Sequence, residues 1–540
     1  RPDGQGPCWR TVPSPPCHSC IADISLTRSA TAWVAGRDSA DMSDYSDTFA
    51  LIFGIALAGV VSFIAWTLFF GDFNGHSGGL KEKSGKAACV SVDGTGGFSE
   101  HSKGGDCAVA PAVGLATALA MSPDGRNAYV AAHREAVAVI DRNPRSGVLS
   151  ARPGPAGCIS RDGTPGGERA RRLRQAAAIA SRRSCAVGRG LFGVTDLAVS
   201  PDGRNVYVGS ADGLAIFDRD RGGGLTQKAG EQGCLTRTGS QRGATTRTPG
   251  CGRARGLFGA RSIAVSPDGR TVYVTSVDVL AFGRDPRTGA LTRLAGRAGC
   301  VAATSQGADG ADCVADPDID GATSVAVSPD SRQVFASSGT DAGGSGDVTI
   351  LDRSRRTGRL VPVRGSAGCI GQGEGCANAR GLRGAAQVVV SADGSNAYVL
   401  SFLDCAVAVF TRDASSGELT QKPGAAGTAT QHASTGACSN RRSSAGGGFA
   451  GGGLALSPDG RTVFVTARAG LAMYARAPRG GALTYKGCVS DDGEDKCDDV
   501  KALNVPVAPV VSPDSRNLYV GVQGGDAVAA FDVPRPKKVG

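Results

Sequence analysis

Apolar segments that flank a short polar turn recur seven times along the chain. Each copy has an apolar segment, the tetrapeptide Ser-Pro-Asp-Gly or a close variant, and a second apolar segment with an aromatic residue near its centre, as in residues 263–276. Short apolar segments bounded by turn residues are typical of β-strands. Pro and Asp favour the backbone angles of a tight turn, and Gly accepts the left-handed conformation that closes it. Each copy is therefore predicted to be a β-hairpin, and the turn aspartates are Asp124, Asp202, Asp268, Asp330, Asp393, Asp459 and Asp514.

Two further apolar segments follow each hairpin. Residues 214–220 and 406–413 are examples of the third segment, and residues 223–230 and 417–424 are examples of the fourth, which contains Gly-x-Leu-Thr. Four short antiparallel strands in each of seven units predict an all-β fold, a seven-bladed β-propeller. The alternative is an open row of hairpins, which would expose long strand edges.

The ends of the repeat region indicate how the ring closes. The last unit stops after its third strand, at residues 528–533, whereas a fourth-strand pattern stands alone at residues 78–85, before the first unit. We expect this N-terminal strand to complete the last blade. The propeller is thus predicted to span residues 78–533, with a linker at 71–77 and a C-terminal tail at 534–540.

Residues 49–70 form an apolar run of 22 residues without a charge. At 1.5 Å per residue a helix of that length spans about 33 Å, enough to cross a hydrocarbon core of about 30 Å. We predict one transmembrane helix here, with a buried core helix or a cleavable signal as alternatives. Residues 1–48 show no periodic pattern, and we expect them to be disordered or mis-annotated, with Met42 as the true start.

The core of the repeat resembles a known family. Ser-Pro-Asp-Gly-Arg-x-x-Tyr-Val, at residues 266–274, and Asp-x-x-x-Gly-x-Leu-Thr, at residues 285–292, are similar to YVTN-type repeats. More specifically, they resemble the lactonase-family seven-bladed propellers, which include 6-phosphogluconolactonase and the carboxymuconate cyclases. The resemblance covers residues 78–533 and implies the fold. It does not imply one activity, because the family also contains non-enzymatic surface and exported proteins.

Fourteen of the 17 cysteines lie in the predicted propeller, and most of them flank the connection from a fourth strand to the next first strand. Local pairs at one place in the repeat predict disulfides, with reduced thiols or metal sites as the alternative. Lys81 and Lys83 follow the apolar run and would alone place the propeller in the cytoplasm. We give the cysteines more weight and predict a membrane-anchored propeller outside the cytoplasm. The predicted pairs are Cys89–Cys107, Cys158–Cys185, Cys234–Cys251, Cys300–Cys313, Cys369–Cys376, Cys405–Cys438 and Cys488–Cys497.

Three groups of residues are candidates for ligand or metal binding. Arg189, Arg255 and Arg380 recur before a first strand and could form a partial cationic ring for a carboxylate or phosphate; the alternative is pairing within the blade. His133, Arg134 and Glu135 have the residue types that lactone chemistry needs, although a solvated loop would look the same. Asp316, Asp318 and Asp320 imitate the start of a calcium loop, but Val327 stands where an EF-hand requires Glu. We predict no cofactor, with a short calcium loop there as the alternative.

Composition narrows the function. Aromatic residues make up 5% of the chain and no basic run dominates its net charge of +10, so nucleic-acid binding is not predicted. We predict a binding or interaction module that presents disulfide-stapled loops on one face to a protein, a carbohydrate or a small carboxylated or phosphorylated ligand. The alternative is a lactonase-like hydrolase or isomerase at the mouth of the central channel.

Overall fold

The computed structural model describes residues 78–95, 107–133, 135–165, 185–242, 250–308, 310, 312–339, 346–371, 373, 375–430, 452–467, 470–491, 497–500 and 502–534. The chain divides into two compact units, Arg1–Asp72 and Phe73–Gly540, and every described residue belongs to the second unit. The predicted segments at 1–48, 49–70 and 71–77 lie outside the described residues. In the described part of the chain, no helix has the length and apolar character needed to cross a membrane.

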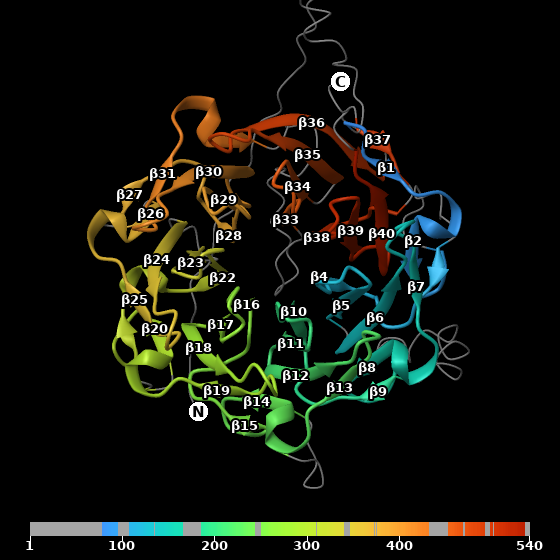
Figure 1. The fold of residues 1–540 in the computed structure, drawn as a ribbon, viewed down its shortest axis with the longest axis horizontal. Helices are drawn as coiled ribbons and strands as arrows, with labels where there is room; N and C mark the ends of the chain where they lie inside the picture. The colour runs from blue at the N-terminus through green and yellow to red at the C-terminus, as the bar shows by residue number, and fades with distance from the viewer. Residues whose placement is uncertain are drawn as a thin grey trace, which may run out of the picture. The chain divides into compact units, whose positions relative to one another are not determined.

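Seven sheets stand as blades around a ring, so the predicted seven-bladed propeller is confirmed (Figure 1). Blade 1 contains β4 (Ala116–Met121), β5 (Asn127–Ala132), β6 (Ala136–Arg142), β7 (Leu149–Ala151), β8 (Cys158–Ser160) and β9 (Ala186–Val187). Blade 2 contains β10 (Val194–Val199), β11 (Asn205–Ser210), β12 (Gly213–Arg219), β13 (Leu225–Gln227), β14 (Cys234–Thr236) and β15 (Gly252–Arg253). Blade 3 contains β16 (Ser262–Val265), β17 (Thr271–Thr275), β18 (Val279–Arg284), β19 (Leu291–Arg293), β20 (Cys300–Ala302) and β21 (Val314–Ala315). Blade 4 contains β22 (Ala322–Val327), β23 (Gln333–Ser338), β24 (Asp347–Arg353), β25 (Leu360–Pro362), β26 (Cys369–Gly371) and β27 (Ala377–Asn378).

The remaining blades follow the same order. Blade 5 contains β28 (Ala385–Val390), β29 (Asn396–Ser401), β30 (Ala406–Arg412), β31 (Leu419–Gln421) and β32 (Thr428–Thr430). Blade 6 contains β33 (Gly453–Leu456), β34 (Thr462–Ala467), β35 (Gly470–Arg476), β36 (Leu483–Ser490) and β37 (Asp498–Asp499). Blade 7 contains β38 (Pro506–Val511), β39 (Asn517–Val522) and β40 (Ala527–Asp532), together with β1 (Lys81–Glu82), β2 (Cys89–Ser91) and β3 (Ala108–Val109). Short 3-10 helices interrupt the fourth strand of most blades: η1 (Gly85–Ala87), η2 (Gly154–Gly157), η3 (Gly230–Gly233), η4 (Gly296–Gly299), η6 (Gly365–Ala367) and η7 (Gly424–Gly427); η5 (Pro317–Ile319) precedes blade 4.

The N-terminal strand closes the ring, as the sequence predicted. β1 and β2 both pair antiparallel with β40, with Lys81 opposite Asp532 and Cys89 opposite Ala529. Lys83 then strengthens the closure, because its Nζ forms an ion pair with Asp532 and donates to the carbonyl of Ser146 in blade 1 at 2.6 Å.

Side-chain hydrogen bonds from the repeated Ser and Asp stabilise the hairpin turns. In blade 1 the hydroxyl of Ser122 donates to Asp124 at 2.6 Å and accepts from the backbone N–H of Asn127 at 3.0 Å. Asp124 also accepts from the N–H of Arg126 at 3.1 Å. Gly125 closes the turn at φ +66°, and the two serines that replace this glycine, Ser331 and Ser515, adopt φ +59° and +55°. A side chain in this left-handed region costs about 1 kcal/mol, so these two turns are strained.

In every blade except blade 7, a buried arginine at the end of the third strand joins the blade to the one before it. In blade 6, Nε of Arg476 donates to the hydroxyl of Tyr398 at 2.8 Å, and Nη2 binds Asp393 at 2.8 Å and Asn396 at 2.7 Å. Nη1 donates to the carbonyl of Gly460 in its own turn at 3.0 Å. We call this group an arginine clasp. The other clasps pair Arg142 with Tyr519 and Asp514, Arg219 with Tyr129 and Asp124, Arg284 with Tyr207 and Asp202, and Arg353 with Tyr273 and Asp268.

The clasps change the titration of their members. Burial raises the pKa of the clasp tyrosines, to about 12 for Tyr129, Tyr207, Tyr273 and Tyr398. Burial also pushes the pKa of Asp393 upward, but hydrogen bonds from Ser391, the Ser395 N–H and Arg476 outweigh it, so the net pKa is lowered. The aspartate therefore stays ionised beside the buried guanidinium.

The glycine of the Gly-x-Leu-Thr pattern has an inter-blade role. Gly147 has φ +70°, and a β-carbon there would lie 2.3 Å from the side chain of Asn517 in blade 7. Its carbonyl accepts a 2.6 Å hydrogen bond from the hydroxyl of Tyr519. Only glycine allows the turn to lie this close to the neighbouring blade.

Two interfaces depart from this arrangement. Between blades 4 and 5, Phe335 replaces the tyrosine, and the buried Nε of Arg412 has no hydrogen-bond partner in the described part of the chain. Between blades 6 and 7, Phe464 replaces the tyrosine and Val533 replaces the arginine, and both are buried in one apolar cluster. The second interface is therefore held by apolar packing.

We predict that Phe335→Tyr stabilises the propeller by about 1 kcal/mol. The added hydroxyl would accept a hydrogen bond from Nε of Arg412 and donate to the carbonyl of Gly417, as Tyr398 does with Gly481. Phe464→Tyr is the matched control, because it buries a hydroxyl where no arginine stands, and it should lower stability by about 1–3 kcal/mol. Denaturant unfolding of the full chain measures both, and equal effects of the two substitutions would contradict this interpretation.

We also predict that Ser331→Gly stabilises the protein by about 0.5–1 kcal/mol, because it relieves the positive φ. Ser515→Gly should gain less, since the hydroxyl of Ser515 accepts a 3.1 Å hydrogen bond from the N–H of Asp459 in blade 6. Thermal unfolding measures both changes. Ser331→Ala keeps the β-carbon, and stabilisation by this variant as large as that by Ser331→Gly would refute the explanation.

Candidate functional site

Disulfides staple the loops that connect successive blades. Six predicted pairs are confirmed, with Cα–Cα distances of 4.8 or 4.9 Å: Cys89–Cys107, Cys158–Cys185, Cys234–Cys251, Cys300–Cys313, Cys369–Cys376 and Cys488–Cys497. Cys405 is also disulfide-bonded, and its predicted partner Cys438 lies outside the described residues. Six disulfides are typical of proteins that fold in an oxidising compartment.

Each staple is followed by a two-residue strand that pairs parallel to the end of the fourth strand, as β15 does with β14 and β21 with β20. Carboxylates from the second-to-third loops then hold the stapled loops. Asp212 accepts from the N–H of Arg242 at 3.0 Å, and Asp278 accepts from the N–H of Ala308 at 2.9 Å. Asp347 accepts from the N–H of Gly373 at 3.0 Å. The stapled loops and the second-to-third loops therefore form one connected face.

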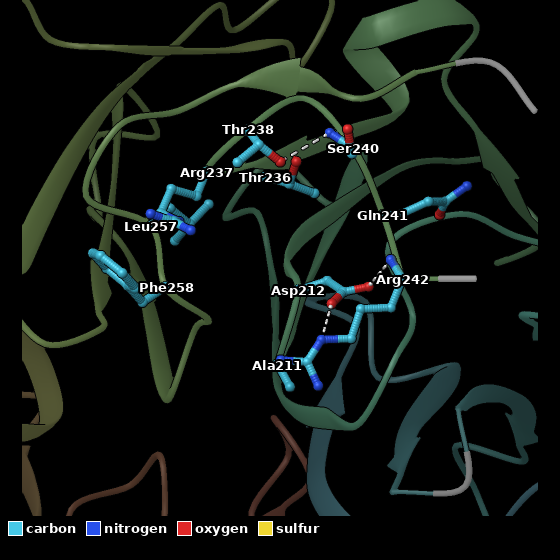
Figure 2. Close-up of a pocket in the computed structure, with 10 residues that line it drawn as sticks. All are labelled: Ala211, Asp212, Thr236, Arg237, Thr238, Ser240, Gln241, Arg242, Leu257 and Phe258. Atoms are coloured by element: carbon cyan, nitrogen blue, oxygen red, sulfur yellow. Dashed lines mark hydrogen bonds and ion pairs between the residues drawn. The ribbon is translucent and has the colours of Figure 1, made fainter. Parts of the chain in front are cut away.

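A pocket of about 310 Å³ opens on this face at blade 2 (Figure 2). Three segments form it: the second-to-third loop of blade 2, the stapled loop that follows Cys234, and the chain that enters blade 3. The lining residues are Ala211, Asp212, Thr236, Arg237, Thr238, Ser240, Gln241, Arg242, Leu257 and Phe258.

Arginines stack on aromatic rings in and beside the pocket. The guanidinium carbon of Arg237 lies 4.7 Å from the ring centre of Phe258, and these side chains lie on the same side of the pocket in Figure 2. Arg242 and Arg161 both lie against Phe192, at 4.9 and 5.5 Å. Such contacts hold each guanidinium in place and contribute about 0.5–1 kcal/mol at exposed sites.

Two acidic side chains complete the charge pattern. Asp212, with a side chain only 7% exposed, lies 3.4 Å from Nε of Arg242. Both oxygens of Glu135 accept from Nη1 of Arg161, at 2.9 and 3.0 Å. Arg237 also lines the pocket, so the lining contains two arginines and one aspartate.

The remaining polar groups orient the loop. Thr236 accepts from the N–H of Gly239 at 3.0 Å, and Gln241 accepts from the N–H of Gly190 at 2.8 Å. Among the lining residues, Phe258 is 43% exposed. The pocket therefore combines hydrogen-bond donors with an apolar rim.

The structure places the predicted catalytic residues at the edge of this region. His133 is exposed, and its ring lies 4.0 Å from the position that a β-carbon on Gly193 would occupy. Glu135 is held by Arg161, and Arg134 lies outside the described residues. His133 has no recorded hydrogen bond to Glu135. A catalytic role for these residues stays a prediction.

The predicted arginine set is distributed over different blades. Arg189 donates to the carbonyls of Gly250, Lys228 and Gly230 at 2.8–3.1 Å, and Arg380 donates to the carbonyl of Gly424 at 3.1 Å. These contacts tie each loop to the backbone of the next blade. Arg255 is exposed. Ligand binding by the set stays a prediction.

In the predicted calcium loop, Asp316 and Asp318 form hydrogen bonds within the protein. Asp316 caps η5 by accepting from the N–H of Asp318 at 3.1 Å, and the carbonyl of Asp318 accepts from Ser338 and Thr349. Burial raises the pKa of Asp316, and burial with the nearby Asp347 raises that of Asp318. Among the described residues the only group of three ligand side chains is Asp318 with Cys369 and Cys376, and both cysteines are in a disulfide. Calcium binding by Asp316, Asp318 and Asp320 stays a prediction.

Sequence reasoning did not identify the pocket residues. Phe192 and Phe258 belong to the two Arg-Gly-Leu-Phe-Gly copies at 189–193 and 255–259, and only the arginines of these copies were expected to bind ligand. The signal was present in the motif itself. The same Phe recurs in both copies beside the arginine that was singled out.

Comparisons with known proteins agree with the repeat architecture. The family model described as WD domain, G-beta repeat matches residues 189–217, which cover the entry loop and first three strands of blade 2. No curated protein sequence matches this chain.

Several solved structures are similar in fold. A periplasmic gluconolactonase from Pseudomonas aeruginosa is 18% identical, covers 74% of this chain and 88% of its own, and has a TM-score of 0.43. Hydrazine synthase from Kuenenia stuttgartiensis is 14% identical, covers 81% and 99%, and has a TM-score of 0.40. A functionally unknown protein from Desulfotomaculum acetoxidans is 14% identical, covers 71% and 87%, and has a TM-score of 0.40. The names of these proteins differ.

Proposed function

We propose that this protein is a binding module whose site is the pocket at blade 2, and that its ligand is a small molecule with a carboxylate or phosphate group. The observation that carries the proposal is Arg237, which is stacked on Phe258 at 4.7 Å inside a 310 Å³ pocket. Because contact with the ring already restricts the arginine side chain, binding an anion costs little further side-chain freedom.

The lining supports an acceptor-rich ligand. Arg237 and Arg242 supply donors, and Thr236, Thr238 and Ser240 add hydroxyl groups. The exposed ring of Phe258 offers an apolar surface for the carbon skeleton. Pockets that bind small molecules usually combine an apolar wall with a few fixed polar groups.

The same residues favour binding over hydrolysis. A general base needs a free carboxylate or imidazole within hydrogen-bond reach of the substrate. The described lining contains one carboxylate, Asp212, which binds both the side chain and the N–H of Arg242, and it contains no histidine. We therefore keep the lactonase-like alternative at His133 as the outcome that would contradict this proposal.

The disulfides also bear on the cellular location of the propeller. Disulfides in the connected loop face support a propeller that works outside the cytoplasm. A membrane anchor at residues 49–70 is part of the proposal.

We predict that glucuronate and glucose 6-phosphate bind the oxidised protein, whereas neutral glucose does not. Arg237→Ala should weaken binding of both anions at least tenfold, because it removes the positioned guanidinium; a tenfold loss corresponds to about 1.4 kcal/mol. Isothermal titration calorimetry measures the affinities. Arg287→Ala is the charge-matched control, since Arg287 is exposed in the third-to-fourth turn of blade 3, away from the pocket.

Two results would contradict the proposal. Equal loss of affinity in Arg237→Ala and Arg287→Ala would show that only net charge matters. Turnover of phosphorylated sugar lactones that falls a hundredfold in His133→Ala would instead establish an enzyme at the edge of the face.

A further inference from the structure

Blades 2 and 3 differ at one internal position beside their disulfides. In blade 2, Gln227 accepts from the N–H of Arg189 at 2.9 Å and donates to the carbonyls of Arg189 and Gly233 at 2.8 Å. Gln421 of blade 5 makes the same contacts with Arg380. In blade 3 the corresponding residue is Arg293, which cannot accept a hydrogen bond.

Arg293 instead contacts the Cys300–Cys313 disulfide. Its Nη2 lies 3.0 Å from Sγ of Cys300, and its buried Nε has no hydrogen-bond partner in the described part of blade 3 and its neighbours. Burial lowers the pKa of the Arg293 guanidinium; Asp278 opposes this effect and the like charge of Arg255 adds to it. A half-buried cation with an unused donor is thus held against a sulfur atom.

A second cation lies at the other end of the same disulfide. Nε of Arg297 donates to the carbonyl of Cys313 at 3.3 Å and lies 3.6 Å from Asp312. The corresponding residue of blade 2 is Glu231, so the Cys234–Cys251 disulfide lacks the counterparts of both Arg293 and Arg297. The cation beside that disulfide is Arg189, which donates to the backbone carbonyls of Gly250, Lys228 and Gly230. Burial of the four cysteines is closely matched, at 0–3% exposed.

Positive charge beside a cysteine stabilises its thiolate, and a stabilised thiolate favours the reduced form and leaves faster in exchange. We propose that Cys300–Cys313 is a redox-modification site, a disulfide that small thiols reduce more readily than its twin Cys234–Cys251. The reaction consumes one dithiol reductant: its two sulfurs form a new disulfide, and the S–S bond of Cys300–Cys313 is replaced by two thiol groups. In the reduced protein, a thiolate at Cys300 would pair with the guanidinium of Arg293.

Reduction would act on the binding face. The stapled loop is held by the hydrogen bond from the N–H of Ala308 to the carboxylate of Asp278. In the second-to-third loop that contains Asp278, the backbone N–H of Ser276 donates to the carbonyl of Asp278. The hydroxyl of Ser276 accepts from the N–H of Phe258, the ring of the pocket. The staple and the pocket are therefore joined by consecutive hydrogen bonds.

The test is equilibrium reduction of the oxidised full chain in mixtures of reduced and oxidised dithiothreitol. Free cysteines are trapped by alkylation and each disulfide is counted by peptide mass spectrometry, with near-UV circular dichroism to confirm that the blades stay folded. At pH 8 we expect the reduction equilibrium constant of Cys300–Cys313 to exceed that of Cys234–Cys251 about fivefold to tenfold. A tenfold ratio corresponds to about 30 mV.

Two variants separate charge from structure. Arg293→Gln, which installs the residue of blades 2 and 5, should remove most of the difference, and Gln227→Arg should raise the equilibrium constant of Cys234–Cys251. The effect of Arg293→Gln should vanish at pH 5, because ordinary thiols have a pKa of about 8.5. At pH 5 the reduced cysteines are protonated in both the parent protein and the variant, so there is no thiolate for the guanidinium to stabilise. An unchanged equilibrium constant in Arg293→Gln, or a change of equal size at pH 5 and pH 8, would overturn the proposal.

Discussion

The arginine clasp is the interaction on which the propeller depends. Each clasp places a guanidinium that is at most 5% exposed between two blades and satisfies it with a tyrosine, an aspartate and a backbone carbonyl. A buried cation without such partners would cost several kcal/mol. The geometry that satisfies it also fixes how far apart, and at what angle, successive blades stand.

The seven inter-blade interfaces are of three kinds, which differ in whether they contain the arginine and the tyrosine of the clasp. Five interfaces have arginine with tyrosine, the interface of blades 4 and 5 has Arg412 with Phe335, and the interface of blades 6 and 7 has Val533 with Phe464. Replacing a buried polar group by well-packed apolar residues is often neutral for stability, whereas removal of one partner is costly. The apolar interface is therefore a second solution, and it occurs where the N-terminal strand completes the ring.

Much of this arrangement could be predicted from the sequence. The seven hairpins, the closing strand at 78–85 and six disulfide pairs each arise from local patterns that repeat. The clasps could not be read in the same way, because Arg476 and Tyr398 lie 78 positions apart and meet only when the ring closes. The pocket at blade 2 was missed for the same reason: Asp212, Arg237 and Phe258 come from three loops whose approach depends on blade packing. Two-residue strands such as β15 carry no periodicity at all.

The arginine clasps, the disulfides and the pocket at blade 2 depend on one another. The arginine clasps fix the spacing of the blades, and the disulfides fix the loops between the blades. The pocket at blade 2 lies among these loops, and the disulfide of the next blade, Cys300–Cys313, lies against Arg293. Sequence differences between equivalent positions, such as Gln227 and Arg293, acquire meaning only on this repeated frame.

The most direct test of the clasp is a double-mutant cycle on Arg476→Met and Tyr398→Phe, with stability measured by denaturant unfolding. Residues that share a buried hydrogen-bond network show coupling energies of about 0.5–3 kcal/mol. We predict that the double variant loses less stability than the sum of the single variants, by at least about 1 kcal/mol. Additive losses would contradict the account, because they would mean that the tyrosine and the arginine stabilise the ring independently.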